Sequence, residues 1–215
     1  IREPWRMGIS YLLDAWGEEF DNLDLAFLKK IAAPKLRVIR KMISQGLNSP
    51  LTSSLGRLFD GVAAILGCGP RVSFEGQAAM ALEMMADANP DFYDESGLYG
   101  DDLITGDVRE FSTRPIISGI VADLKTGVSP AEISTRFHLS LVRMYARRCD
   151  LIRSETGLNR VALSGGVFQN ALFLKGLLAN LEKKGFQVFT PSLVPANDGG
   201  ISLGQALVAA AEAKK

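Results

Sequence analysis

Residues 161–170 read VALSGGVFQN, and this stretch decides the expected fold. Its first three residues are apolar, a run short enough for a buried strand. The next three, Ser-Gly-Gly at 164–166, interrupt the run, and Asn170 stands where a helical pattern begins. A strand, a glycine turn and a helix start leave unpaired backbone N–H groups that an anion can reach. The stretch predicts either a phosphate or nucleotide site or a tight turn without a ligand.

A second strand is expected shortly after this turn. The helical pattern covers residues 168–184 and ends at Gly185, and FQVFT at residues 186–190 has the composition of a strand. Strand, helix and strand at this spacing predict a parallel pair with a right-handed crossover. Residues 160–190 are therefore a βαβ unit, and the fold class is α/β with many helices.

The tail carries a third glycine-containing stretch, NDGG at residues 197–200. Asn197 or Asp198 can cap the last helix, which makes a structural role available to either side chain. Ligands of open α/β sheets bind outside the carboxyl ends of the strands, where this turn and the first glycine turn would both lie. Asp198 is thus equally a candidate metal or phosphate ligand.

The remaining chain has helical periodicity, with apolar residues recurring three and four positions apart. Helices are expected at residues 4–16, 25–31 (capped by Asp24), from 34 onward, 55–66 (capped by Ser53 or Ser54), 75–88 (with its methionines in the core), 115–127 and 130–156. A small hairpin is expected over residues 101–112. His138 is expected to be a packed helix residue and not a ligand.

Two glycines interrupt the helical pattern of residues 55–66. Gly56 and Gly61 each cost about 1 kcal/mol against alanine in a helix interior. Their presence indicates that another backbone or a ligand comes close to this helix. Both explanations stay open on the local pattern.

Composition narrows the class of protein. Lys+Arg and Asp+Glu both number 24, so there is no net charge to attract nucleic acid or an anionic membrane. The two cysteines, Cys68 and Cys149, lack zinc-site spacing and favour a reducing, cytoplasmic compartment. No apolar run approaches the roughly 20 residues of a membrane span. The chain opens on Ile1, and we expect it to be a piece of a longer protein.

Three motifs in order carry a family resemblance: SSLGRLFDGVAA at 53–64, SGGVFQN at 164–170 and NDGGISLGQA at 197–206. With REPWRM, EGQAAMALE and RFH, they closely resemble the C-terminal part of the HypF family of carbamoyltransferases, over nearly the whole chain. The resemblance implies the C-terminal lobe of a TsaD-like domain with the actin and sugar-kinase fold. Residues 1–50 would be a helical segment and 51–215 the nucleotide-binding lobe.

The HypF resemblance implies a reaction in the maturation of nickel–iron hydrogenases. Carbamoyl phosphate and ATP would give carbamoyl-adenylate in a separate YrdC-like domain. The TsaD-like domain would transfer the carbamoyl group to the C-terminal cysteine of HypE, and dehydration would yield the cyanide ligand of the iron.

The resemblance also assigns roles to individual residues. Gly56 and Asp60, in GRLFD, match positions that contact the nucleotide or adenylate, although Arg57 and Gly61 depart from the TsaD pattern. The residues expected to line the phosphate and nucleoside side are Gly165, Gly166 and Asn170.

Asp198 matches a ligand of a divalent metal, zinc or iron. The two histidine ligands of that metal belong to an HxxxH motif absent from this sequence, so the metal site would be incomplete here. No catalytic nucleophile is expected within the chain, because the attacking thiol comes from the partner.

Two alternatives stay open at this point. One is an O-carbamoyltransferase of the TobZ type that acts on a sugar hydroxyl. The other is a nucleotide-binding lobe that is inactive on its own.

Overall fold

A computed structural model describes residues 2–69, 71–87, 97–100 and 111–213. The chain divides into two compact units, Ile1–Ser140 and Leu141–Lys215, and each is described by itself. The boundary falls inside the long helix α7. None of the helices in the described part of the chain combines the length and apolar character needed to cross a membrane.

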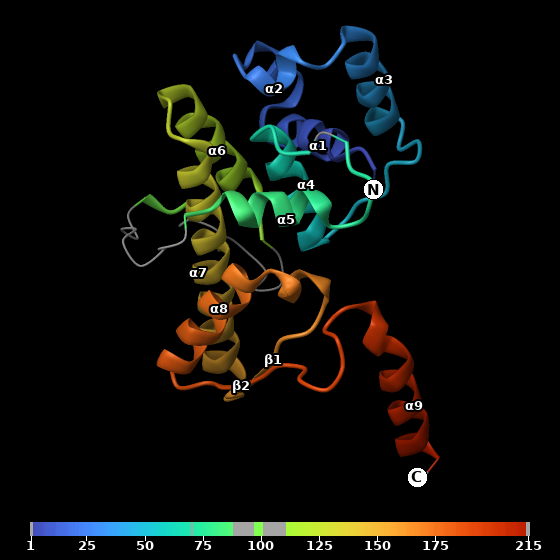
Figure 1. Ribbon diagram of the computed structural model, residues 1–215, viewed down its shortest axis with the longest axis vertical. Helices are drawn as coiled ribbons and strands as arrows, with labels where there is room; N and C mark the ends of the chain where they lie inside the picture. Colours follow the sequence, from blue (N-terminus) through green and yellow to red (C-terminus); the bar gives the residue numbers. More distant parts are fainter. Residues whose placement is uncertain (1, 70, 88–96, 101–110, 214–215) are drawn as a thin grey trace. The chain divides into compact units, whose positions relative to one another are not determined.

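Helices dominate the first unit (Figure 1). They are α1 (Pro4–Trp16), the 3₁₀ turn η1 (Gly17–Asn22), α2 (Ala26–Lys29), α3 (Ala33–Ser44), α4 (Leu55–Ile65), α5 (Gln77–Met85), α6 (Arg114–Thr126) and the start of α7 (Pro130–Thr156). The second unit holds the end of α7 and both strands. Its other elements are β1 (Arg160–Ala162), η4 (Gly166–Gln169), α8 (Ala171–Lys183), β2 (Gln187–Phe189), η5 (Asp198–Gly200) and α9 (Ile201–Glu212).

A close crossing of α1 and α4 organises the first unit. A Cβ atom added at Gly61 would lie 2.6 Å from Cδ2 of Tyr11, and one added at Gly8 would lie 3.4 Å from the carbonyl oxygen of Gly61. A side chain at Gly61 would displace the ring of Tyr11, and one at Gly8 would displace the ring of Phe27, whose Cζ lies 2.8 Å from the added atom. The helix-crossing explanation is therefore right for Gly61, whereas Gly56 has only Ser54 Oγ nearby, at 3.6 Å.

The centre of the first unit is aromatic. The ring of Phe59 meets the rings of Phe137 and His138 edge-on, at centroid distances of 5.0 and 5.3 Å. His138 is fully buried, and its Nδ1–H donates to the carbonyl oxygen of Ser134 at 2.8 Å. Burial lowers the pKa of His138 from 6.5 to about 4. The prediction of a packed helix histidine is confirmed.

In the second unit β1 and β2 pair in parallel, as predicted, with Arg160 opposite Gln187 and Ala162 opposite Phe189. Aromatic contacts join α8 to its surroundings, since Phe173 stacks on Phe168 and meets Tyr145 edge-on. The prediction of a buried strand was too strong. Only one face of this two-stranded sheet is covered, so Ala162 and Phe189 are exposed.

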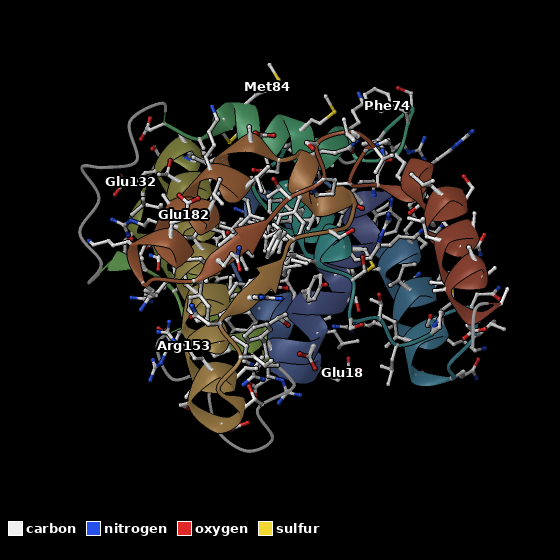
Figure 2. All side chains as sticks on the ribbon, turned by 90° about the horizontal axis from the view of Figure 1, so that it is seen from below. Glu18, Phe74, Met84, Glu132, Arg153 and Glu182 are labelled. Carbon is white, nitrogen blue, oxygen red and sulfur yellow. The ribbon has the colours of Figure 1, made fainter. Side chains whose placement is uncertain are left out.

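Several local predictions need correction. Asp24 does not cap α2, because Leu25 holds the cap position without a side-chain bond and Asp24 pairs with Lys29 at 2.6 Å. The methionines of α5 are not all core residues: Met80 and Met84 are 53% and 84% exposed, and Met84 stands out from the surface in Figure 2. The helix expected at 168–184 begins later, because residues 166–169 form the η4 turn.

Other predictions have different outcomes. Ser54 caps α4 by accepting from the N–H of Arg57 at 3.4 Å, as predicted. The hairpin predicted for residues 101–112 falls almost entirely outside the described residues. The division at residue 50 differs from the division into units and stays a prediction.

Replacing Gly61 with alanine is expected to lower the free energy of unfolding by about 1–3 kcal/mol, because the new methyl group would clash with Tyr11. The matched control is Gly56→Ala in the same helix, where space is open. That change should raise the free energy of unfolding by about 0.5 kcal/mol through helix propensity. Urea denaturation measures both, and equal effects would contradict the close crossing.

Acidification is expected to destabilise the chain through His138. The imidazole of His138 takes up a proton at higher pH in the unfolded chain than in the folded chain. The contribution of His138 to the free energy of unfolding is therefore fully present above pH 6.5 and falls as the pH drops toward about 4. The loss over this window should be about 3 kcal/mol. Urea denaturation at several pH values should show this loss in the wild type but not in His138→Leu. Parallel pH profiles of the two proteins would refute the assignment.

Candidate functional site

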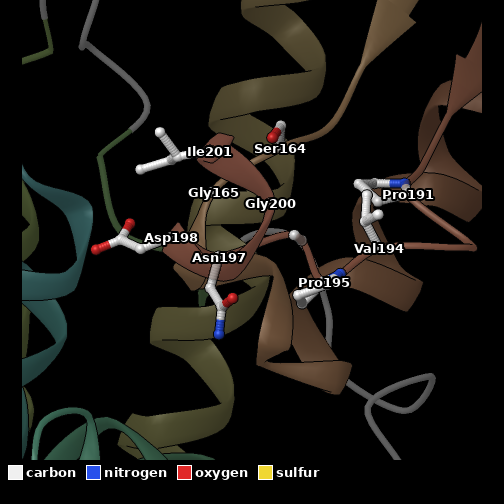
Figure 3. A pocket seen from close by; sticks show the side chains of 10 residues that line it. Ser164, Gly165, Pro191, Val194, Pro195, Asn197, Asp198, Gly200 and Ile201 are labelled. Atoms are coloured by element: carbon white, nitrogen blue, oxygen red, sulfur yellow. The ribbon is translucent and has the colours of Figure 1, made fainter. Parts of the chain in front are cut away.

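A pocket of about 260 Å³ opens in the second unit at the carboxyl ends of β1 and β2 (Figure 3). Two turns supply its walls, the glycine turn after β1 and the longer connection that follows β2. The lining residues are Ser164, Gly165, Pro191, Val194, Pro195, Ala196, Asn197, Asp198, Gly200 and Ile201. The pocket thus brings together two of the predicted site residues, Gly165 and Asp198.

A short hydrogen bond joins the two turns. The N–H of Gly165 donates to the carbonyl oxygen of Ala196 at 2.7 Å. A Cβ atom added at Gly166 would lie 3.8 Å from the Cβ of Asn197, which is ordinary contact distance. Gly165 has φ +119°, a conformation that favours glycine. The expectation that Asp198 lies beside the first glycine turn agrees with this geometry.

In the first turn, one backbone N–H group is hydrogen-bonded within the chain and two others are available to a ligand. The N–H of Gly165 is committed to Ala196. The N–H groups of Gly166 and Val167 have no acceptor among the described residues. These two amides, at the start of η4, are the groups that an anion in this region can use.

The second turn is capped by Asn197. Its Oδ1 accepts from the N–H of Gly199 at 3.0 Å, and its carbonyl oxygen accepts from the N–H of Gly200 at 3.0 Å. Asp198 therefore caps nothing, and α9 begins after Gly200 without a side-chain cap. The prediction that Asn197 or Asp198 caps the last helix is wrong: Asn197 caps the η5 turn that precedes α9, and Asp198 caps neither element.

The Asp198 carboxylate is exposed and has no hydrogen bond or ion pair within the described part of the chain. Figure 3 shows Asp198 and Asn197 leaving the same turn in different directions. A carboxylate without a structural task beside a pocket is available to a cation or to a ligand hydroxyl.

Asn170 has a structural task of its own. Its Oδ1 accepts from the N–H of Phe173 at 2.8 Å and caps α8, and the residue is buried. A role toward the nucleotide stays a prediction. The cap fixes the start of α8 directly after the η4 turn, so it supports the geometry of the Gly166 amide.

The other two predicted residues, Gly56 and Asp60, belong to the first unit. Asp60 is buried, and its Oδ2 lies 3.0 Å from Arg57, which also reaches Glu75 at 3.4 Å. Burial raises the pKa of Asp60 against the opposing charge of Arg57, and the pKa of Tyr11 rises to about 12 through burial and the charge of Asp60. The contact of Gly56 and Asp60 with a nucleotide stays a prediction.

Ser164 lines the pocket but was not among the site residues predicted from the sequence. Its side chain is exposed at the carboxyl end of β1 and lines the pocket with Asp198. Its position directly after a strand was the signal that could have identified it. Pro191, Val194 and Pro195 were also missed, because a proline-rich connection has no chemical signature.

The described residues provide only one of the ligands expected for the metal, the carboxylate of Asp198. No group of three or more His, Cys, Asp or Glu side chains suited to a metal occurs among the residues described. Zinc and iron ordinarily take three or four protein ligands, so Asp198 alone does not fit either of them as a complete site. Burial raises the thiol pKa of both Cys68 and Cys149, which disfavours their thiolate forms.

A parallel strand pair with its pocket at the carboxyl ends of the strands defines an α/β lobe of the ligand-binding type. The family described as "Carbamoyltransferase, Kae1-like Domain, second subdomain" matches residues 1–205. The chain belongs to this family. The predicted fold class, a helix-rich α/β lobe of the actin and sugar-kinase type, is confirmed, as is the HypF resemblance.

Named relatives and one solved structure agree with the family. The chain is 37% identical to carbamoyltransferase HypF of Rhodobacter capsulatus over 98% of its length, and 33% identical to that of Synechocystis over 96%. A crystal structure of full-length HypF in the phosphate- and nucleotide-bound form superposes with a TM-score of 0.84, with 37% identity over 97% of this chain. The chain spans 26–27% of the length of these relatives.

Removing the α8 cap should cost stability in a way that depends on the hydrogen bond. Asn170→Ala is expected to lower the free energy of unfolding by about 1 kcal/mol, whereas Asn170→Ser, which keeps an acceptor, should lower it by only a few tenths. Thermal or urea unfolding of the two variants measures the difference. If both lose the same stability, Asn170 stabilises the chain by something other than its cap.

Proposed function

We propose that the full-length protein containing this chain is a carbamoyltransferase of nickel–iron hydrogenase maturation, and that this chain supplies the nucleotide-binding lobe. The carbamoyl group would pass from carbamoyl-adenylate, made from carbamoyl phosphate and ATP, to the C-terminal cysteine of HypE. Membership in the HypF-type domain family over residues 1–205 supports this activity. The relatives at 33–37% identity are named carbamoyltransferase HypF, which supports carbamoyl transfer.

The observation that carries the proposal is the pocket shared by Gly165 and Asp198. It joins a glycine turn with available amides to an uncommitted carboxylate. A related HypF of the same fold was crystallised with phosphate and a nucleotide, which supports an anionic nucleotide as the ligand. The cytoplasm, where ATP and carbamoyl phosphate are found, is the proposed compartment.

In this proposal the amides of Gly166 and Val167 bind phosphate oxygens, because both N–H groups lack an internal acceptor. Ser164 adds a hydroxyl donor from the same turn. Gly56 and Asp60 are proposed to contact the nucleotide or adenylate, and Asn170 is proposed to line the nucleoside side in addition to capping α8.

The transfer itself needs little covalent chemistry from this chain. The HypE thiolate attacks the carbamoyl carbon, a C–S bond forms, and the bond from that carbon to the phosphate oxygen breaks. AMP leaves with the electron pair, and the thiol proton has already passed to solvent when the thiolate formed. Amides that hold the phosphate stabilise the charge on the leaving AMP.

The metal enters as a proposal for the full-length protein. Asp198 would be one ligand of a zinc or iron ion, and two histidines from outside these residues would complete the set. Such an ion would supply Lewis-acid polarisation when bound.

A second possibility applies to the 215 residues alone. These residues offer only one candidate metal ligand, the carboxylate of Asp198. Because the metal site would be incomplete, the isolated lobe is proposed to bind nucleotide without transferring carbamoyl groups. Activity of the isolated chain would contradict this proposal.

The transfer can be tested on the full-length protein with ATP, carbamoyl phosphate and purified HypE, by weighing HypE in a mass spectrometer. Wild type should add a carbamoyl-derived mass, and Asp198→Ala should reduce the rate at least about 100-fold, as expected for loss of a metal or transition-state ligand. The melting temperature of the metal-free full-length protein should stay unchanged, because this carboxylate makes no contact among the described residues.

Two outcomes would contradict the proposal. Full activity of Asp198→Ala would contradict the role of Asp198 in the site but not the proposed carbamoyl transfer. A wild-type protein that is folded and metal-loaded but inactive would contradict the proposed hydrogenase-maturation activity itself. Glu212→Ala, an exposed carboxylate on α9 away from the pocket lining, is the matched charge control.

A further inference from the structure

We propose that Asn197 is a positioning residue: its side-chain oxygen holds the turn that presents Asp198, and it thereby keeps the two turns of the pocket in their binding arrangement. This inference rests on the proposed function. It deepens that function by naming a residue whose contribution is to order the nucleotide pocket before the ligand arrives.

The first support is the pair of hydrogen bonds that Asn197 accepts. Oδ1 takes the N–H of Gly199 and the backbone oxygen takes the N–H of Gly200, both at 3.0 Å. One residue thus closes the η5 turn from both its side chain and its main chain. Asp198 sits at the first position of that turn, so its backbone direction is set by these two bonds.

The second support is the position of Asn197 next to the glycine turn. Its Cβ lies at contact distance, 3.8 Å, from the position that a side chain on Gly166 would occupy. The preceding residue, Ala196, accepts the N–H of Gly165 at 2.7 Å. Asn197 therefore lies beside the glycine turn, directly after the residue that is hydrogen-bonded to it, and its side chain holds the turn of Asp198.

The third support is the conformational freedom that the Asp198 turn would have without the side-chain hydrogen bond of Asn197. Asp198 is followed by two glycines, which lose more conformational freedom on ordering than any other residue. Larger residues are disfavoured here: a Cβ at Gly200 would lie 2.9 Å from the carbonyl oxygen of Pro195, and one at Gly199 would lie 3.0 Å from the Pro195 ring. The Asp198 side chain adds no bond within the described chain. The side-chain bond of Asn197 is thus the constraint that offsets this freedom.

A disordered turn lowers apparent affinity, because only the ordered fraction of the molecules binds the ligand. Loss of a side-chain cap should therefore weaken nucleotide binding by up to about five-fold. The effect should depend on the presence of an acceptor at residue 197 and not on the size of its side chain.

The test uses two variants of the full-length protein. Asn197→Leu keeps the Cβ and a similar volume but has no acceptor, whereas Asn197→Ser is smaller and keeps an acceptor of equal capping strength. Amide hydrogen exchange of the segment holding Gly199 and Gly200, without ligand, reports on the turn. Calorimetric titration with ATP reports on the pocket.

Asn197→Leu should speed exchange in this segment and weaken ATP binding about five-fold, and Asn197→Ser should stay within about two-fold of wild type in both measurements. Equal losses in the two variants would overturn the hydrogen-bond role. A looser turn with unchanged ATP affinity would overturn the link to the pocket, and no change in either measurement would overturn both.

The two proposals fail in different ways. A wild-type protein that binds no ATP contradicts the proposed nucleotide function and removes the pocket-ordering role of Asn197 with it. The exchange measurement then still decides whether Asn197 holds the turn. Wild-type binding with an unaffected Asn197→Leu contradicts only the positioning role.

Discussion

The hydrogen bond from the N–H of Gly165 to the carbonyl oxygen of Ala196, at 2.7 Å, is the constraint on which the candidate site depends. It joins two turns that are about thirty residues apart in sequence and follow different strands. A parallel pair brings its carboxyl ends to one edge, but the register of three-residue strands fixes their turns only loosely. This bond ties the turns directly, and a pocket forms where they meet.

The same bond decides which groups remain for a ligand. It consumes the amide of Gly165 and leaves those of Gly166 and Val167 without an internal acceptor. The available donors therefore lie one residue later than the sequence motif suggests. Asn170 then caps α8 immediately downstream, so the available amides lie between two fixed points. Pre-ordered donors of this kind favour an anion because little reorganisation is needed on binding.

The sequence predicted the elements well where the physics is local. The ends of the helices predicted at residues 4–16, 115–127 and 130–156 coincide with positive φ angles at Gly17, Gly127 and Gly157. The cap at Ser54 likewise rests on a side-chain acceptor that a short segment specifies by itself. Prediction from the sequence failed where burial depends on distant partners. A helix of alanines and methionines has the same pattern whether Met84 is covered or 84% exposed.

The candidate site shows the same division. The motif containing Gly165 and Gly166 could be identified from spacing, but the choice between Asn197 and Asp198 as a cap could not, because both side chains can accept from a nearby amide. Only the geometry of the turn assigns the bond to Asn197 and leaves Asp198 uncommitted. The ion pair of half-buried Arg57 with buried Asp60 could not be predicted for a similar reason, since α4 is buried from Leu58 to Ile65 and not along a single stripe.

Hydrogen exchange of the full-length protein with and without ATP tests the central claim most directly. If the two joined turns are the nucleotide pocket, ATP should slow exchange at the amides of Gly166 and Val167 and in the segment from Ala196 to Ile201, while the amides of α3 stay unchanged. ATP binding that leaves both turns as exchangeable as before would place the nucleotide elsewhere and contradict the account.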